Sequence, residues 1–237
     1  MTDRQIITRR GFLTGLGGIA IAGGSAGAAS IPAVREPFLD AVSRLNDRVQ
    51  GQLFSRNRLA PEYAEGKITH PFRYNGFYPE AYAPALDPAT WCLQIDGRVA
   101  RPAALSLTDL RAMTQHAQIT RLICIEGWSA VGKWSGVRLS DVLHRLGADT
   151  SARFVRFECA DDYHSSIDMA SALHPQTILA LDFLDRPLPQ AFGAPMRLRI
   201  PVKLGFKNAK FIKRMTVTND FPGGYWEDQG YNWFAGI

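Results

Sequence analysis

Apolar residues recur at intervals of three and four along the stretch from residue 38 to residue 54. They are Leu39, Val42, Leu45, Val49 and Leu53. This spacing places them on one face of a helix, so the stretch predicts an amphipathic helix at the periphery of the protein. From residue 59 to residue 88, prolines interrupt any regular pattern. The aromatic residues between those prolines predict an ordered, packed loop.

From Trp91 onward, short apolar runs typical of strands alternate with short helical segments. The expected strands cover residues 91–95, 119–125, 154–159, 178–184, 196–202 and 213–219. One helix is expected to be capped by Ser106 or Thr108 and to run to residue 115, and a second to run from 139 to 146 and stop at Gly147. Because no strand–helix–strand unit repeats, the pattern predicts an α+β fold.

The 237 residues are enough for one substantial core, and the formal charge of +5 is only mildly basic. The first 28 residues carry +2 of that charge, which leaves +3 for the remainder. A weak positive balance suits an anionic cofactor or substrate. It falls far short of the dense basic surface that nucleic-acid binding needs, so we expect no nucleic-acid partner.

The N-terminus has the order of a targeting signal, which is charge, then an apolar run, then small residues. The paired Arg9 and Arg10 are typical of a twin-arginine leader, and Ala26 and Ala28 offer a small-residue cleavage site. Residues 1–28 are therefore predicted to be a signal peptide for export to the periplasm. The alternative is an uncleaved membrane anchor, which the many glycines of the run disfavour.

The three cysteines, at positions 92, 124 and 159, form no close pair, so at least one thiol is unpaired. Cys124 is expected near the end of the strand over 119–125, just before a turn. A thiolate there can bind a soft or high-valent metal, and nearby basic side chains are expected to lower the pKa of the thiol. Taken alone, a cysteine between Ile123 and Ile125 is more often a small buried hydrophobe.

The same stretch contains Gly127, Ser129 and Val131 at the spacing of the nucleophile elbow of serine hydrolases. Val131 replaces the last glycine of that elbow, whose strained turn needs small residues on both sides of the serine. The pattern therefore gives only a weak indication of a hydrolase.

Cationic residues gather around Gly205. They are Arg197, Arg199, Lys203, Lys207, Lys210, Lys213 and Arg214. A glycine loop with cationic side chains suits a phosphate, because the backbone can approach the anion while the cations neutralise it. The alternative is a solvated basic edge strand that prevents aggregation. Aromatic residues between 225 and 234 either line the mouth of a site or cap the core, and residues 161–164 are expected to form a turn.

Two groups of residues, taken together, resemble the molybdopterin-binding domain of the sulfite oxidase superfamily over residues 69–217. The groups are residues 124–129 followed by Trp134, Ser135 and Gly136, and residues 193–197 followed by Pro201, Lys203, Gly205, Phe206 and Lys207. Within the superfamily the chain is most similar to periplasmic catalytic subunits that reduce methionine sulfoxide in proteins. The resemblance implies a single-domain, mixed-sheet α+β fold over 69–237, preceded by a helical extension over 29–68.

The resemblance implies that Cys124 is the catalytic residue and ligates molybdenum through its thiolate, beside the dithiolene of the cofactor. It also implies a set of cofactor-binding positions, which are Asn75, Tyr78, Cys159, Arg197, Lys203, Lys207, Asn208, Ala209 and Lys210. Three positions depart from the family pattern: Cys159 replaces a threonine, Phe192 an asparagine and Pro79 an acidic residue. Because polar groups near a metal help to select the substrate, these departures leave the substrate open.

The activity is also implied by the resemblance. We expect an exported oxidoreductase with molybdenum-molybdopterin as its cofactor, which reduces a small sulfoxide or, alternatively, oxidises sulfite. No haem domain of the animal type is expected in the chain, so electrons must come from a separate partner such as a haem protein. No permanent membrane span is expected either. The rival from another class is a non-catalytic exported binding module in which Cys124 is a core residue.

Overall fold

The structure is a computed structural model that describes residues 32–237, with side chains from residue 35 onward. The predicted signal peptide over 1–28 lies outside the described residues. The described chain divides into two compact units, one ending at Leu45 and the other spanning Asn46–Ile237. None of its helices is long and apolar enough to cross a membrane.

Helix α2 covers Pro32–Leu53 and therefore includes most of the stretch predicted to be helical. Its apolar side chains before residue 46 are exposed, namely Phe38, Leu39, Val42 and Leu45. In the second unit, the end of the helix is bonded to the C-terminal residues. Asp47 Oδ1 accepts hydrogen bonds from Asn232 Nδ2 at 2.7 Å and from the Phe234 amide at 2.9 Å. These bonds hold the C-terminal residues against the last turns of α2.

The loop that follows α2 is irregular, as its prolines predict, and contains only the short 3₁₀ turns η2 (Glu65–Lys67) and η3 (Glu80–Tyr82). It is also packed, because Phe72 meets Trp134 and Phe183 edge-to-face at centroid distances of 5.6 and 5.0 Å. Rings in this arrangement attract one another beyond the area they bury. The loop thereby covers a small second core around Trp134.

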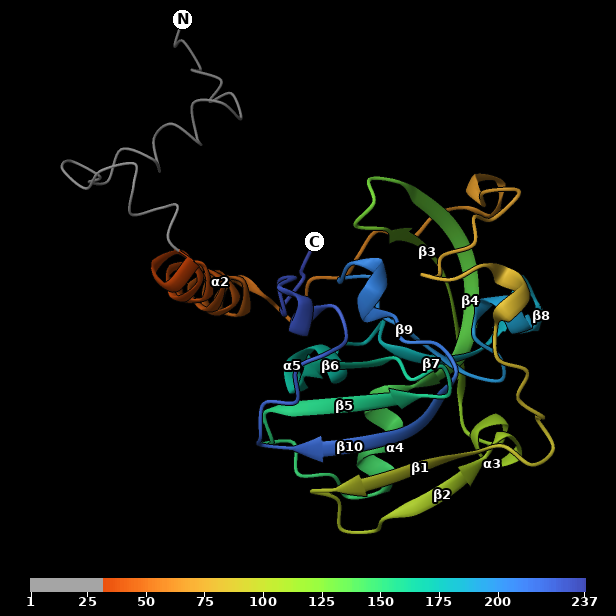
Figure 1. Ribbon diagram of the computed structural model, residues 1–237. Helices are drawn as coiled ribbons and strands as arrows, with labels where there is room; N and C mark the ends of the chain where they lie inside the picture. Colours follow the sequence, from red (N-terminus) through yellow and green to blue (C-terminus); the bar gives the residue numbers. More distant parts are fainter. Residues whose placement is uncertain (1–31) are drawn as a thin grey trace, which may run out of the picture. The chain divides into compact units, whose positions relative to one another are not determined.

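The first sheet has five strands in the order β2-β1-β10-β5-β6 (Figure 1). They are β1 (Cys92–Gly97), β2 (Ala103–Ser106), β5 (Phe154–Cys159), β6 (His164–Asp168) and β10 (Ile212–Thr218). Strands β1 and β10 are parallel, whereas the other neighbours are antiparallel. The sheet is therefore mixed, as expected.

The second sheet is antiparallel, in the order β3-β4-β7-β8, with β9 also paired to β7. Its strands are β3 (Gln115–Ile123), β4 (Ser129–Arg138), β7 (Ile178–Phe183), β8 (Arg186–Pro187) and β9 (Arg197–Arg199). The predicted strand over 196–202 is thus only three residues long. Strands β7 and β9 are buried on both faces, so their side chains do not alternate between core and solvent.

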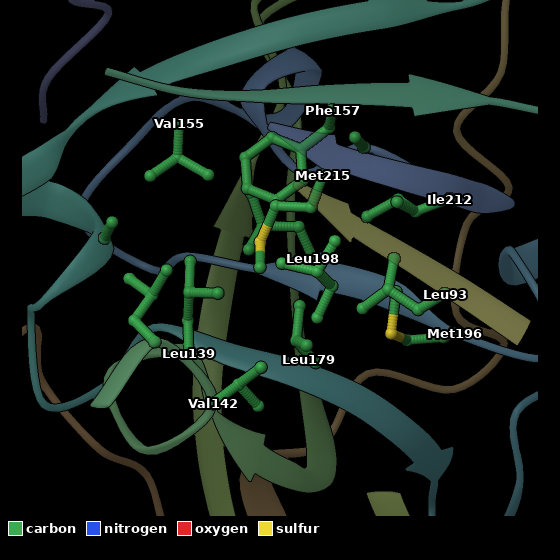
Figure 2. Close-up of a cluster of buried hydrophobic side chains, with 14 of the residues drawn as sticks. Leu93, Leu139, Val142, Val155, Phe157, Leu179, Met196, Leu198, Ile212 and Met215 are labelled. Atoms are coloured by element: carbon green, nitrogen blue, oxygen red, sulfur yellow. The ribbon is translucent and has the colours of Figure 1, made fainter. Parts of the chain in front are cut away.

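The main core joins the two sheets and the helix α4 (Leu139–Arg145), whose residues Leu139 and Val142 are fully buried. Figure 2 shows part of this cluster, in which Phe157 and Met215 of the first sheet lie close to Leu198 of the second. Helix α4 ends as predicted, because Gly147 adopts a φ of +63°, a conformation that favours glycine.

Helix α3 (Leu107–Arg111) begins at the predicted cap but is shorter than expected. The Asp109 amide donates to Ser106 Oγ at 3.1 Å, and the Ser106 amide donates to Asp109 Oδ2 at 2.9 Å, which is a capping box. The prediction that this helix reaches residue 115 was wrong, because Gln115 already pairs with Val137 in the second sheet. Strand β6 and the short helix α5 (Met169–Ala172) were not predicted.

Candidate active site

Cys124 lies in the tight turn that joins β3 to β4. Ile123 and Ser129 form the last pair of this hairpin, and the Cys124 amide donates to the Trp128 carbonyl at 2.9 Å. Gly127 closes the turn with a φ of +89°, which a residue with a side chain rarely adopts. Cys124 was predicted near the end of a strand over 119–125, just before a turn. The turn is present, but the strand ends at Ile123, so Cys124 is the first residue of the turn and not part of the strand.

The Cys124 side chain is half-buried and lines an open cleft of about 110 Å³. Other lining residues come from four segments distant in sequence, and they include Asn75, Phe77, Asp161, Gly205, Phe206, Asn208, Ala209, Lys210 and Trp226. Gly205 approaches the turn closely, since a Cβ there would lie 3.3 Å from the Ile123 carbonyl oxygen and 3.5 Å from Cys124 Cα. Cys124 is therefore not enclosed in solid packing.

Two charged residues lie beside the thiol. Glu126 Oε2 lies 3.8 Å from Cys124 Sγ and accepts a hydrogen bond from Trp128 Nε1 at 2.8 Å, while the Arg73 guanidinium stacks 4.8 Å from the Trp128 ring. Burial raises the pKa of the Cys124 thiol, and the negative charge of Glu126 adds to this. A backbone hydrogen bond at Glu126 and the charge of Arg73 act in the opposite direction without reversing it. The basic neighbour Arg73 thus lowers this pKa as expected, but burial and the carboxylate outweigh it, so the pKa is raised and not lowered overall.

Lys210 supplies the cation that lines the cleft. Its Nζ donates to the Ala191 carbonyl at 3.2 Å and lies 4.7 Å from the centre of the Tyr74 ring. Burial, followed by repulsion from Arg197, lowers the pKa of Lys210 to about 7. The Tyr74 hydroxyl is buried without a hydrogen-bond partner among the described residues. This wall therefore has unused capacity to bind an anion with hydrogen-bonding groups.

Arg197 and Arg199 are fully buried on β9 without a carboxylate partner in the described structure. Arg197 donates to the Phe192 and Asn208 carbonyls, and Arg199 donates to Asn208 Oδ1 and Thr120 Oγ1. Burial lowers the pKa of each guanidinium to about 9. Since a buried, uncompensated charge is costly, an anion bound close to Arg197 and Lys210 would be favoured electrostatically.

Lys203 and Lys207, in contrast, do not line the cleft. Lys203 Nζ donates to the Phe234 carbonyl at 2.8 Å and lies 3.3 Å from Asp168, whereas Lys207 forms a buried ion pair with Glu227. The reading of this segment as a solvated basic edge strand is wrong. Both side chains are buried, and β10, which follows them, lies inside its sheet.

Lys203 is expected to make stability depend on pH. Burial lowers its pKa to about 7, despite the opposing charge of Asp168, so the folded protein loses this proton well before the unfolded chain does. Stability should therefore rise as pH increases above 7, by at most about 1.4 kcal/mol per pH unit, and should gain no slope from this group below pH 7. Urea unfolding at pH 7, 8 and 9 should show that Lys203→Met makes this rise smaller, because only Lys207 and Lys210, whose pKa values are also lowered, still contribute to it. Lys213→Met, an exposed change, should keep the full rise. Parallel curves for wild type and Lys203→Met would contradict the prediction.

Of the sequence-predicted site residues, the structure brings Asn75, Cys124, Asn208, Ala209 and Lys210 together at the cleft. Tyr78, Cys159, Arg197, Lys203 and Lys207 do not line it. Tyr78 lies next to the lining, because its hydroxyl donates to Asp161 Oδ2 at 2.8 Å. Cys159 is buried behind the lining, and burial raises the pKa of its thiol well above the usual range.

Several residues of the cleft received no role from the sequence, among them Asp161, Glu126 and Phe77. Asp161 was assigned to a turn, Glu126 lies inside the motif around Cys124, and Phe77 belongs to the irregular loop. The signal that could have found Asp161 is its place just after the strand that ends at Cys159. Both readings of the C-terminal aromatic residues hold in part, because Trp226 lines the cleft and Phe234 is buried elsewhere.

The weak hydrolase pattern does not form a nucleophile elbow. Such an elbow places its serine on a turn between a strand and a helix. Ser129 instead opens strand β4 and pairs with Ile123. Ser129 is also absent from the residues that line the cleft beside Cys124.

Comparison with known proteins identifies the family. The oxidoreductase molybdopterin binding domain matches residues 80–226, which is more than half of the chain, and the chain belongs to this family. A solved structure, the sulfane dehydrogenase SoxCD from Paracoccus pantotrophus, has a TM-score of 0.55 over 58% of this chain and 40% of that one. At 20% identity, this likeness concerns the fold alone. The fold class, the family and the molybdopterin cofactor predicted from the sequence are confirmed.

Two curated relatives are similar over much of the chain. The "Putative protein-methionine-sulfoxide reductase subunit YedZ1" of Azospira oryzae is 53% identical over 85% of this chain and 77% of its own length. The protein-methionine-sulfoxide reductase catalytic subunit MsrP of Xanthomonas campestris is 32% identical over 69% of this chain. This chain covers 59% of the length of that MsrP.

The residues at the cleft fit a molybdopterin cofactor. Cys124 and Lys210 line the cleft and offer a soft sulfur ligand and a positive charge for an anionic group. Beside Lys210 lie the buried Arg197 and the Tyr74 hydroxyl, which lacks a hydrogen-bond partner among the described residues. Gly205 keeps side-chain atoms away from the backbone of the Cys124 turn. The lining thus combines a sulfur that could bind a metal with a lysine that could bind an anion.

Proposed function

We propose that this chain is an exported molybdenum enzyme that reduces sulfoxides, and that methionine sulfoxide is the leading candidate for its substrate. The observation that carries the proposal is that one cleft is lined both by a partly accessible thiol, Cys124, and by a lysine, Lys210. The names of the relatives from Azospira oryzae and Xanthomonas campestris support the choice of substrate.

In this proposal Cys124 ligates the metal, and Asn75, Ala209 and Lys210 contact the pterin part. When bound, the cofactor supplies two-electron oxygen-atom transfer. Because the free thiol has a raised pKa, it must release a proton on metal binding, and Glu126 Oε2, at 3.8 Å from Sγ, is placed to accept it. Asn208 acts indirectly, since its side chain is already bonded to Arg199, to the Ile200 amide and to the Leu204 carbonyl.

The remaining predicted cofactor positions fall into two groups. Arg197 and Tyr78 lie beside the lining and act through Lys210 and Asp161, the residues that they adjoin. Cys159, Lys203 and Lys207 support the segments that carry the site, because their side chains are buried away from the cleft. Lys203 and Lys207 thus hold the loop that follows β9, and the contact with the phosphate of the cofactor is assigned to Lys210, with Arg197 buried beside it.

The substrate side of the cleft is aromatic. Phe77 stacks on Tyr225 at 5.1 Å and meets Trp226 edge-on at 6.1 Å, and both Phe77 and Trp226 line the cleft. Aromatic rings form favourable contacts with the sulfur of methionine-like side chains. They also limit the access of water to the reacting centre. A sulfoxide with an apolar substituent therefore suits this mouth better than the small anion sulfite.

The reduction of a sulfoxide consumes two electrons and two protons and yields a thioether and water. We propose that the electrons come from a separate partner, such as a haem protein, and that the enzyme works in the periplasm. The support for export is the twin-arginine pattern at Arg9 and Arg10. The domain bounds proposed are a signal peptide over 1–28, an extension over 29–68 and the molybdopterin-binding domain over 69–237.

Metal analysis and a single-turnover reaction test the function. Protein expressed with its leader should contain about one molybdenum and one pterin per chain, and methionine sulfoxide should reoxidise the chemically reduced protein. Sulfite should reduce the oxidised protein far more slowly. Protein with stoichiometric cofactor that reacts with sulfite alone would favour the second candidate, sulfite oxidation. Protein prepared under the same conditions without molybdenum would refute both.

A further inference from the structure

A second pocket lies in the unit Asn46–Ile237 and shares no lining residue with the cleft at Cys124. Its volume of about 550 Å³ falls within the range of sites for small organic molecules. Its walls come from the end of α2, the segment from 55 to 63, the end of β3, the turn after β9 and the C-terminal residues. Ile123, the last residue of β3, lines this pocket, and the next residue, Cys124, lines the cleft. The two cavities are therefore neighbours at the end of β3.

The walls of this pocket are held by hydrogen bonds and are therefore preformed. The Ala60 amide donates to Gln176 Oε1 at 2.8 Å, and Gln176 Nε2 donates back to the Ala60 carbonyl at 3.0 Å. On the other side, the Ile237 amide donates to the Val202 carbonyl at 3.2 Å, and the Gly236 amide donates to Gln50 Oε1 at 3.1 Å. A ligand would not have to order these segments on binding, which favours affinity.

The lining is mostly apolar, and its charged side chains are all of one sign. Its apolar side chains are Leu53, Phe54, Leu59, Ile123, Val202, Phe234 and Ile237. Its charged side chains are those of Arg58 and Arg121, and no lining residue is aspartate or glutamate. Arg121 stacks 5.1 Å from the centre of the Tyr63 ring, and within the described residues neither guanidinium forms an ion pair. The two arginines thus retain their capacity to bind an anion.

We propose that this pocket binds an organic monoanion with an apolar body, such as a medium-chain carboxylate. The apolar walls would bury the body, and the two guanidiniums would bind the carboxylate through charge-assisted hydrogen bonds. A neutral molecule would leave the guanidiniums unused, and a small inorganic anion would leave the apolar walls in contact with water. The combination of walls and charges therefore selects molecules that carry both features.

Calorimetric titration of the holoprotein with decanoate tests the proposal. We expect saturable binding of one decanoate per chain, at least about tenfold tighter than the binding of decan-1-ol, and no binding of acetate. Arg121→Ala and Arg58→Ala should each weaken decanoate about tenfold. Leu59→Glu, at an exposed lining residue, should abolish binding by placing a carboxylate beside the arginines. Arg186→Ala, an exposed arginine outside the pocket, should change nothing.

Several outcomes would overturn the proposal. Equal affinity for decanoate and decan-1-ol would remove the role assigned to the charges. Equal affinity in wild type and Leu59→Glu would place decanoate elsewhere. If the protein sedimented with phosphatidylglycerol vesicles but showed no saturable binding of decanoate monomers, the pocket would be a contact site for a membrane surface and not a site for a small molecule. The experiment measures binding and not catalysis. Its result therefore tests this proposal independently of the proposed oxidoreductase activity.

Discussion

Replacement of Cys124 by alanine is expected to lower the reductase activity at least about 100-fold. Loss of residues that merely support a metal ligand already costs 10- to 100-fold, and Cys124 is proposed to be the ligand itself. The measurement is the rate of methionine sulfoxide reduction with a chemically reduced dye as electron donor, so that no protein partner is needed. The fold should survive, because Cys124 lies in a solvent-accessible turn outside both hydrophobic cores.

Cys92→Ala is the matched control for this variant. Cys92 begins β1 in the other sheet, and its sulfur accepts a hydrogen bond only from Gln94 Nε2, at 3.1 Å, among the described residues. Its removal should leave the rate within about twofold of wild type, as is usual for a surface change away from a site. Full activity in Cys124→Ala, with normal molybdenum content, would exclude the proposed ligand.

Glu227→Gln is expected to lower the free energy of unfolding by about 3 to 5 kcal/mol. Glu227 and Lys207 form an ion pair whose side chains are 3% and 1% exposed. The substitution removes the negative charge and leaves the Lys207 ammonium buried without its partner. Deprotonation of Lys207 limits this loss of unfolding free energy, because the neutral amine no longer needs a partner. Burial already lowers the pKa of this lysine and so favours its deprotonation. Urea unfolding at pH 7 measures the effect.

Two further variants separate the buried pair from its surroundings. Asp228→Asn removes the neighbouring carboxylate, which is 61% exposed and paired with His164, and should cost less than about 1 kcal/mol. The double variant Lys207→Met, Glu227→Leu should recover most of the stability lost in Glu227→Gln, because it removes both buried charges. If Glu227→Gln proved as stable as Asp228→Asn, the buried pair would not be formed.

Much of the fold follows from local patterns that the sequence displays directly. Strand β5 has the predicted bounds, Ser106 caps α3 through its own side chain, and Gly147 stops α4 with a positive φ. Each of these features depends on residues within a few positions of one another. For the same reason, the place of Cys124 where an apolar strand meets a turn could be predicted to within one or two residues.

Strand β4 shows what a local pattern cannot reveal. Glycines inside a strand normally weaken it, so the stretch with Gly132 and Gly136 did not indicate one. In the structure, a Cβ at Gly132 would lie 2.8 Å from the Phe183 ring, and one at Gly136 would lie 2.0 Å from the Leu179 carbonyl oxygen. The glycines are therefore required by neighbours on β7, which is distant in sequence.

The cationic residues are the second example. Lysines are rarely buried, so the sequence pattern allowed two interpretations of Lys203 and Lys207, a phosphate site or a solvated edge strand. Their partners Asp168 and Glu227 lie 35 and 20 residues away, and no periodicity links them. The same limit applies to the pKa of Cys124, which depends on burial in a cleft that only the tertiary structure reveals.

X-ray absorption at the molybdenum edge tests most directly whether Cys124 binds the metal. The spectrum of the wild-type holoprotein should require one more sulfur neighbour of molybdenum than that of Cys124→Ser, with the same cofactor content in both. The same sulfur count in the two proteins would contradict the assignment of Cys124 as the ligand, whatever the activity of the variant.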